Sequence, residues 1–195
     1  MDLRSAAESS DADLVIRARR GDDTACELLM RAHQEAVFRL AYLFLHDADE
    51  AEDATQETFI RALRALDEFD LERPLRPWLL RIATNVVRNR QRAVGRYLQA
   101  MRRWLQSEPA PVAGLTERSG PQWEAQLLWQ AVRRLARSDQ EVLYLRYFLD
   151  LGEAEMAGAL DMPPGTVKSR LHRATTRLRM IVDGEFPALR EERQP

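Results

Sequence analysis

The feature that most constrains the fold is a helical pattern near the C-terminus, between Gly165 and Ile181. Its apolar residues recur at steps of three and four, so they fall on one face of a helix. These residues are Val167, Leu171, Ala174, Leu178 and Ile181. The opposite face is polar and basic, and it contains no acidic residue. The pattern therefore predicts a helix that packs against a core on one side and presents positive charge on the other.

A shorter helix is predicted immediately before this one, at 153–160. Its inward residues are Met156, Ala157 and Leu160, and the break Asp-Met-Pro-Pro separates the two helices. Pro164 suits the first position of the second helix, because an N–H there has no partner within the helix anyway. A helix, a tight turn and a basic helix form the layout of a helix-turn-helix. An ordinary helical hairpin with a solvated cationic face is the simpler alternative.

Charge is segregated in the first half of the chain. Six acids and no Lys or Arg lie between Leu40 and Ile60, whereas nine arginines and no acid lie between Arg73 and Trp104. Nine like charges repel one another unless an anion screens them, and a phosphate backbone is the natural anion. The two blocks therefore favour two partners of opposite charge, although a hydrated helix face is the simpler interpretation of each block.

The acidic block falls on one predicted helix, which begins near Asp47 and runs to about Leu66. The residues expected to face inward or to flank the core are Ala51, Ala54, Thr55, Thr58, Phe59, Ala62, Leu63 and Leu66. The opposite face carries Glu52, Asp53, Gln56 and Glu57. Acids near a helix N-terminus are stabilised by the helix dipole, so their pattern alone favours a hydrated face over a docking surface.

Two further helices are predicted before the acidic one. Ser10 can cap a helix that runs to Arg20, and Gly21 can end it in the left-handed conformation. One of the two aspartates that follow then begins a longer helix. His33 falls beside the apolar stripe of that helix, so we expect a hydrogen-bonded structural histidine there and no catalytic role.

After the acidic helix, a loop with two prolines leads into a long basic helix, predicted from Pro77 to about Leu105. Residues 106–121 contain three prolines and two glycines, which is typical of a linker. An amphipathic helix at 123–136 follows. Ser138 and Glu141 are expected to form a capping box for the next helix, which would begin at Asp139.

Every predicted element is a helix, and no segment shows the alternation of a strand. We therefore expect an all-α fold of two small helical domains, at 11–105 and 122–182, joined by a flexible linker at 106–121.

Several functions are disfavoured by composition. Cys26 is the only cysteine, so no internal disulfide is possible, and the three histidines are too scattered for metal-ligand spacing. No apolar run approaches transmembrane length, and the acidic N-terminus lacks the features of a signal peptide. We therefore expect a cytoplasmic chain with no metal site, no cofactor and no membrane insertion.

Several motifs, in this order and spacing, resemble a known family. They are D-A-T-Q-E-T-F-I-R-A-L at 53–63, P-W-L-L-R-I-A-T-N-V-V-R-N-R-Q-R at 77–92, V-L-Y-L-R-Y-F-L-D-L at 142–151 and G-T-V-K-S-R-L-H-R-A at 165–174. The chain resembles bacterial sigma factors of the extracytoplasmic-function group, which belongs to the sigma-70 family. The first two motifs resemble the family's region 2, and the last two resemble its region 4. The likeness covers about residues 11–105 and 123–182.

The resemblance implies a sigma factor that directs promoter recognition and is not an enzyme. Core RNA polymerase would bind it through the clamp of the beta-prime subunit and the flap of the beta subunit, and an anti-sigma factor would inhibit it. The polymerase-binding candidates are Glu52, Asp53, Gln56 and Glu57. The candidates for binding the −10 element are Phe69, Arg76, Trp78, Asn85, Arg88, Asn89 and Arg92. The candidates for binding the −35 element are Thr166, Lys168, Ser169, Arg170, His172, Arg173 and Arg177.

Two positions depart from the family pattern. Asn89 stands where the family more often has Asp, which puts the −10 sequence preference in doubt, because Asn both donates and accepts hydrogen bonds. Asp161 stands where the family usually has Gly, but Asp can adopt the required backbone at modest cost.

Two other functions remain open from the sequence. A conventional repressor or activator would use the helix-turn-helix without polymerase, but it would give the acidic helix no task. A metal-dependent nuclease would use the carboxylates near Asp53, but the sequence shows no recognisable catalytic set around them.

Overall fold

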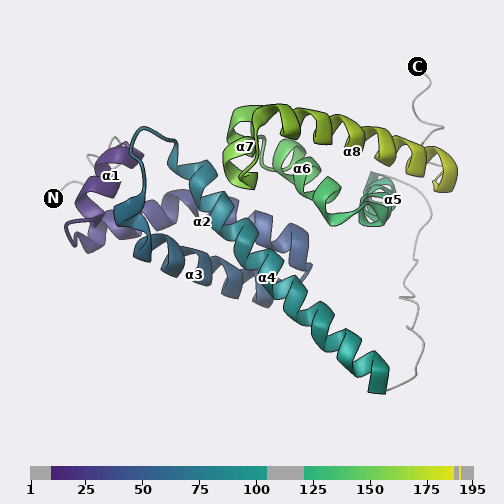
Figure 1. Ribbon diagram of the computed structural model, residues 1–195, viewed down its shortest axis with the longest axis horizontal. Helices are drawn as coiled ribbons and strands as arrows, with labels where there is room; N and C mark the ends of the chain where they lie inside the picture. The colour runs from purple at the N-terminus through teal and green to yellow at the C-terminus, as the bar shows by residue number, and fades with distance from the viewer. Residues whose placement is uncertain (1–9, 105–120, 187–188, 190–195) are drawn as a thin grey trace. The chain divides into compact units, whose positions relative to one another are not determined.

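A computed structural model describes residues 10–104, 121–186 and 189, and this part of the chain is helical and contains no strand. Apart from Pro121, the predicted linker at 106–121 lies outside the described residues. The described elements are α1 (Asp11–Ala18), α2 (Asp23–Leu45), α3 (Ala48–Arg64), the 3-10 helix η2 (Leu66–Glu68), α4 (Leu75–Trp104), α5 (Pro121–Arg134), α6 (Arg137–Tyr147), α7 (Glu153–Leu160) and α8 (Pro164–Glu185) (Figure 1). The predicted all-α fold is confirmed.

The chain divides into two compact units. The first comprises the N-terminal helices up to Leu98 together with residues 154–162, which carry α7. The second comprises residues 99–153 and 163–195, and so contains α5, α6 and α8. The predicted domain boundaries differ from this grouping in placing α7 with the C-terminal helices.

Side-chain caps and one glycine fix the ends of α1 and α2, as the sequence predicts. The Ser10 hydroxyl accepts a hydrogen bond from the Asp13 amide at 3.2 Å. Gly21 ends the turn after α1 with a φ of 83°, a conformation that glycine adopts without steric cost. Asp22 then caps α2, and its hydrogen bonds from the Arg17 side chain and the Ala25 amide lower the pKa of its carboxyl group.

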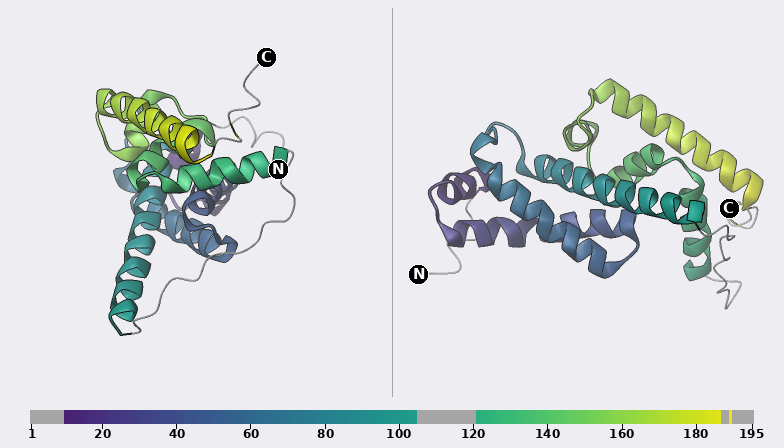
Figure 2. Two further views of the ribbon diagram at one scale, coloured as in Figure 1. Left: turned by 90° about the vertical axis from the view of Figure 1, so that its right-hand side faces the viewer. Right: turned by 60° about the horizontal axis from the view of Figure 1, so that its bottom comes forward.

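The core of the first unit lies where α2 and α3 run side by side, as both views show (Figure 1 and Figure 2). Helices α1 and α4 also contribute, and the fully buried side chains of the unit include Val15 of α1, Leu40 of α2, and Leu80 and Val86 of α4. Three buried threonines donate their hydroxyls to the carbonyl four residues earlier, each at 2.7 Å; they are Thr55, Thr58 and Thr84. These bonds matter because a buried hydroxyl without a partner is costly.

His33 has the structural role expected from the sequence. Its side chain is buried, and Nε2 lies 3.1 Å from both carboxylate oxygens of Asp11. The contact joins the beginning of α1 to the middle of α2. A buried imidazole held in this way serves packing and orientation.

The second unit is built around α8, which packs against α5 and α6. Val142, Val167 and Ala174 are fully buried at this packing. An aromatic cluster continues the core, with the ring of Trp129 centred 5.9 Å from Tyr144 and 5.1 Å from Phe148. Burial raises the pKa of Tyr144 to about 12. Tertiary packing of this kind, more than helix propensity, stabilises short helices.

The predicted capping box at Ser138 and Glu141 is wrong. Helix α6 begins at Arg137, and its N-cap residue, Ala136, makes no side-chain hydrogen bond. Asp139 is buried and accepts a hydrogen bond from Arg177 of α8 at 2.5 Å. The acid that the sequence places at the start of the helix is therefore turned inward and paired with α8.

A short turn separates α7 from α8, as the sequence predicts. Asp161 adopts a φ of 56°, so Asp does take the left-handed conformation that the family usually gives to Gly. The Met162 amide donates to the Ala157 carbonyl at 3.0 Å and closes the end of α7. Helix α8 then begins at Pro164, as predicted.

None of the described helices is both long and apolar enough to cross a membrane.

We predict that Arg177→Ala destabilises the protein by about 1–3 kcal/mol, because it leaves the buried carboxylate of Asp139 without its partner. The effect stays below that of a fully buried pair because the Arg177 side chain is half exposed. Urea unfolding followed by circular dichroism measures it. Arg179→Ala is the matched control, since Arg179 is exposed on the same helix. Equal stability of the two variants would show that the pair adds nothing.

Candidate protein and nucleic-acid interfaces

The first candidate surface is the outer face of α8. Val167 and Ala174 are fully buried, so the helix is oriented as the wheel predicts. Thr166 and Arg170 are half-buried at the edges of this face. The exposed residues are Lys168, Ser169, His172, Arg173 and Thr176. An exposed, acid-free helix face with this mixture of donors is suited to the major groove of DNA.

Several of these side chains also bond to their own helix. Ser169 donates its hydroxyl to the Thr166 carbonyl at 3.1 Å, and Arg173 donates Nε to the Ser169 carbonyl at 3.2 Å. An arginine carries five N–H donors, and this bond uses one of them. Arg173 is therefore held against α8 while its terminal fork remains on the exposed side.

Arg177 belongs to a different set of contacts. Its guanidinium donates to the buried carboxylate of Asp139, so the side chain ties α8 to the start of α6. Arg177 thus supports α8, and its contact with DNA stays a prediction. The other six candidates lie on or beside the outer face.

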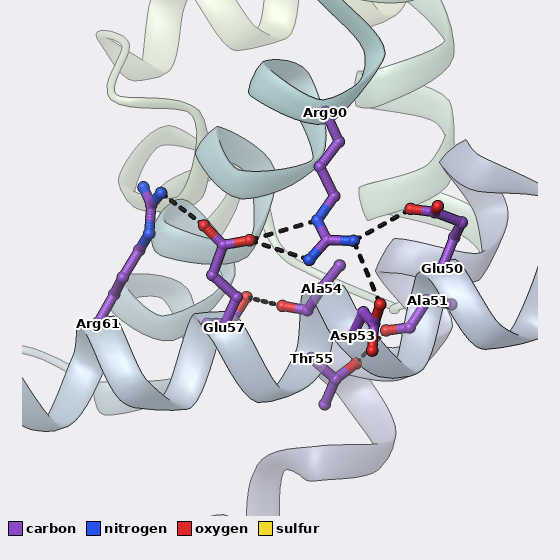
Figure 3. Close-up of polar contacts among 9 residues, drawn as sticks. Glu50, Ala51, Asp53, Ala54, Thr55, Glu57, Arg61 and Arg90 are labelled. Carbon is purple, nitrogen blue, oxygen red and sulfur yellow. Dashed lines mark hydrogen bonds and ion pairs between the residues drawn. The ribbon is translucent and has the colours of Figure 1, made fainter. Parts of the chain in front are cut away.

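The second candidate surface is the acidic side of α3, which the structure divides into two stripes. At about 100° per residue, Glu50, Asp53 and Glu57 share one direction, whereas Glu52 and Gln56 point roughly 110° away. The first stripe faces α4 and meets the guanidinium of Arg90 (Figure 3).

Arg90 joins α3 to α4 through all three acids of that stripe. Its Nη1 lies 3.0 Å from Glu50 and 3.9 Å from Asp53, and its Nη2 lies 3.0 Å from Glu57. Glu57 also pairs with Arg61 at 2.6 Å. Burial disfavours the charge on Arg90, but the hydrogen bonds to Glu57 and Glu50 more than offset it and raise its pKa above the usual value. Much of the charge of this stripe is thus neutralised within the protein.

The second stripe lines a groove between α2 and α3. Glu52 and Gln56 are exposed there, and the groove has a volume of about 580 Å³. The other lining residues are Met30, Gln34, Glu35, Phe38, Thr55 and Phe59. Two more apolar side chains, Ile60 and Leu63, are at least 40% exposed on α3. An apolar groove with an acidic edge is suited to a protein partner that brings both apolar and basic groups.

The sequence did not indicate the contribution of α2 to this groove. Met30, Gln34 and Phe38 recur at steps of four, so helical spacing does place them on one face. That face lies beside the apolar stripe of α2. Whether residues beside such a stripe are buried or exposed depends on where the neighbouring helix packs, which the sequence does not show.

The third candidate surface is the face of α4 that carries Trp78, Asn85, Asn89 and Arg92. Their spacing of seven, four and three residues puts them on one side of the helix. Asn85, Asn89 and Arg92 are exposed, and Trp78 is half-buried. The remaining candidates on α4, Arg76 and Arg88, are also half-buried. Amide groups exposed beside a basic helix can read the edges of bases.

Phe69 does not lie on that face. Its side chain is only 5% exposed, and its ring centroid lies 4.9 Å from that of Trp78. Phe69 therefore packs against Trp78, and its contact with DNA stays a prediction.

The carboxylates near Asp53 show no metal-site geometry. Among the described residues, no group of three or more His, Cys, Asp or Glu side chains is arranged to hold a metal ion. Glu50, Asp53 and Glu57 converge on the guanidinium of Arg90, which already supplies a cation to these three acids.

Comparison with known families assigns both parts of the chain. Residues 29–97 match the family model for sigma-70 region 2, and residues 125–178 match the model for sigma-70 region 4. The first match covers most of α2, then α3 and most of α4, and the second match includes the helix-turn-helix.

Full-length relatives agree with this assignment. The chain is 32% identical to the ECF RNA polymerase sigma factor SigW of Bacillus subtilis, over 84% of this chain and 91% of the relative. It is 33% identical to the RNA polymerase sigma-H factor of Pseudomonas aeruginosa, over 94% and 98%. The solved structure of CnrH in complex with the cytosolic domain of CnrY has a TM-score of 0.68 at 25% identity, covering 91% of this chain and 99% of CnrH. The chain therefore belongs to the sigma-70 family of RNA polymerase sigma factors and is an alternative sigma factor of the extracytoplasmic-function (ECF) group.

Proposed function

We propose that the protein joins core RNA polymerase and directs transcription at one class of promoters. In this proposal α8 reads the −35 element, and the exposed face of α4 binds the −10 element and helps to melt it. The proposal rests on one observation: acidic and basic surfaces lie on different helices. The groove between α2 and α3 has an acidic edge, whereas α4 and the outer face of α8 are basic and contain no acid. A partner of each charge then has its own surface.

The groove between α2 and α3 is the proposed site for the clamp of the beta-prime subunit. It is preferred to the Arg90 stripe because it combines exposed Glu52 and Gln56 with an apolar lining, whereas Glu50, Asp53 and Glu57 already meet Arg90. We also propose that the flap of the beta subunit binds the protein. The similarity to CnrH, which was solved with the cytosolic domain of CnrY, supports a second protein partner. We propose that this partner is of the anti-sigma class.

The docking proposal predicts that the double variant Glu52→Arg, Gln56→Arg loses core polymerase. Two new positive charges beside the groove should repel a basic partner and lower affinity by at least about tenfold. Both positions are exposed, so stability should change by no more than about 0.5 kcal/mol each. Copurification with core enzyme measures the effect.

Asp67→Arg is the matched control, because Asp67 is an exposed acid outside the groove. Normal binding by the folded double variant would place the docking surface elsewhere. Normal DNA binding by wild-type protein without any polymerase association would instead favour a conventional helix-turn-helix regulator.

The melting proposal predicts that Asn85→Ala and Asn89→Ala slow the opening of duplex promoter more than they weaken binding to a pre-melted template. Taking a base out of the stack costs a few kcal/mol, and hydrogen bonds to the exposed base must offset that cost. Fluorescence of a base analogue in the −10 element reports opening. Gln130→Ala, which removes an exposed amide on α5, is the control. Equal effects on both templates would show that these amides merely support the helix.

The reading proposal predicts that Arg173→Ala flattens the preference at one or two −35 positions. An arginine that pairs with guanine through two hydrogen bonds is worth about 1–3 kcal/mol at that base. Arg179→Ala should instead weaken binding to all sequences, as expected for the loss of a phosphate contact. The slope of the logarithm of the binding constant against the logarithm of the salt concentration should fall in magnitude by about one. Selection of −35 variants by each mutant holoenzyme at two salt concentrations separates the two roles. If Arg173→Ala keeps the full preference, the reading face has been misplaced.

A further inference from the structure

One arginine joins the N-terminal helix to the loop that leads into α4. Arg19, just after α1, donates Nε to the Leu66 carbonyl at 3.0 Å and donates Nη2 to the Phe69 carbonyl. Leu66 and Phe69 flank the 3-10 turn that follows α3. In Figure 1 and in the right-hand view of Figure 2, α1 lies beside this loop.

Helix α1 is packed against the rest of the first unit, and this packing holds the backbone of Arg19 in place. Leu14 and Val15 are buried against the first unit. At the other end of the helix, Asp11 contacts the buried His33 at 3.1 Å. Long side chains lose conformational freedom when they bond, and a rigid helix with two anchors lowers that entropic cost.

The two carbonyls that Arg19 holds sit at the point where the chain turns toward the proposed −10 surface. The Phe69 ring packs on Trp78, and Trp78 shares a helix face with Asn85, Asn89 and Arg92. Leu66 and Phe69 are both buried. The Leu66 carbonyl also accepts a hydrogen bond from the Phe69 amide at 3.1 Å, and Arg19 adds a side-chain donor to it and to the Phe69 carbonyl. A planar guanidinium can serve two carbonyls at once, whereas a lysine ammonium cannot match that fork.

We propose that Arg19 is a positioning residue for promoter melting: through the Leu66 and Phe69 carbonyls, α1 sets the loop that supports Trp78 and the −10 surface. Helix α1 precedes residue 29, where the match to the region 2 family model begins, so that match gives it no role. The inference rests on the proposed function, because it takes the face of α4 as the −10 surface.

Two control variants distinguish a positioning role of Arg19 from a general contribution to folding stability. Its neighbour Arg20 is exposed in the turn after α1 and has the same charge. Removal of either charge changes the electrostatic attraction for DNA alike, but only Arg19 contacts the loop. Val37→Ala provides a second control, because it creates a cavity at a fully buried position of α2.

The experiment uses holoenzymes reconstituted with wild-type protein, Arg19→Ala, Arg19→Lys, Arg20→Ala and Val37→Ala. A promoter is first selected from a genomic library by the wild-type holoenzyme. Three quantities are then measured: affinity for core polymerase, affinity for a forked template with an exposed −10 strand, and the rate of opening of duplex promoter. Thermal unfolding of each free protein records the loss of stability.

We expect Arg19→Ala to lower affinity for the exposed −10 strand and the opening rate by about tenfold, as for the loss of charge-assisted hydrogen bonds. Affinity for core polymerase should not change. Arg19→Lys should recover part of the loss, and Arg20→Ala should match wild type. Val37→Ala should lower the unfolding temperature without a selective loss on the forked template.

Two results would overturn the inference while leaving the proposed function intact. One is an Arg19→Ala holoenzyme that opens the promoter as wild type does. The other is an Arg19→Ala variant that loses core binding and −10 binding in parallel, in proportion to its loss of stability. A wild-type holoenzyme that selects no promoter would contradict the proposed function itself, and the role of Arg19 would fall with it.

Discussion

The guanidinium of Arg90 organises the charges between α3 and α4, where it meets Glu50, Asp53 and Glu57. The acids of α3 that face α4 share this one positive charge, and Glu52 lies at the groove. The second unit uses the same device, since Asp139 neutralises Arg177 on the inner side of α8. In each unit an ion pair fixes a helix and leaves the remaining charges for a partner.

Most of the helical fold could be predicted from the sequence because its determinants are local. Apolar spacing identifies the helices, and caps such as Ser10 and Asp22 fix their first residues. The burial of Val167 and Ala174 confirms the predicted orientation of α8. Asp161 also adopts the left-handed conformation that the turn requires.

The parts that could not be predicted are contacts between helices far apart in sequence. Arg177 reaches Asp139 across 38 positions, and Arg90 reaches Glu57 across 33. A helical wheel gives the direction in which a side chain leaves the helix. A long arginine side chain can carry its guanidinium well away from that direction, to an acid on another helix. The capping box at Ser138 failed for the same reason, because Asp139 turned inward to α8. The burial of Phe69 likewise follows from the fold of its loop, which no periodicity describes.

The most direct test of the account is in vitro transcription with purified protein, core RNA polymerase and a genomic promoter library. An alternative sigma factor should yield transcripts from a small set of start sites that share one −35 and one −10 element. Core enzyme alone should not start at those sites. Specific DNA binding by the protein, with no association with core enzyme and no start sites that depend on it, would contradict the account.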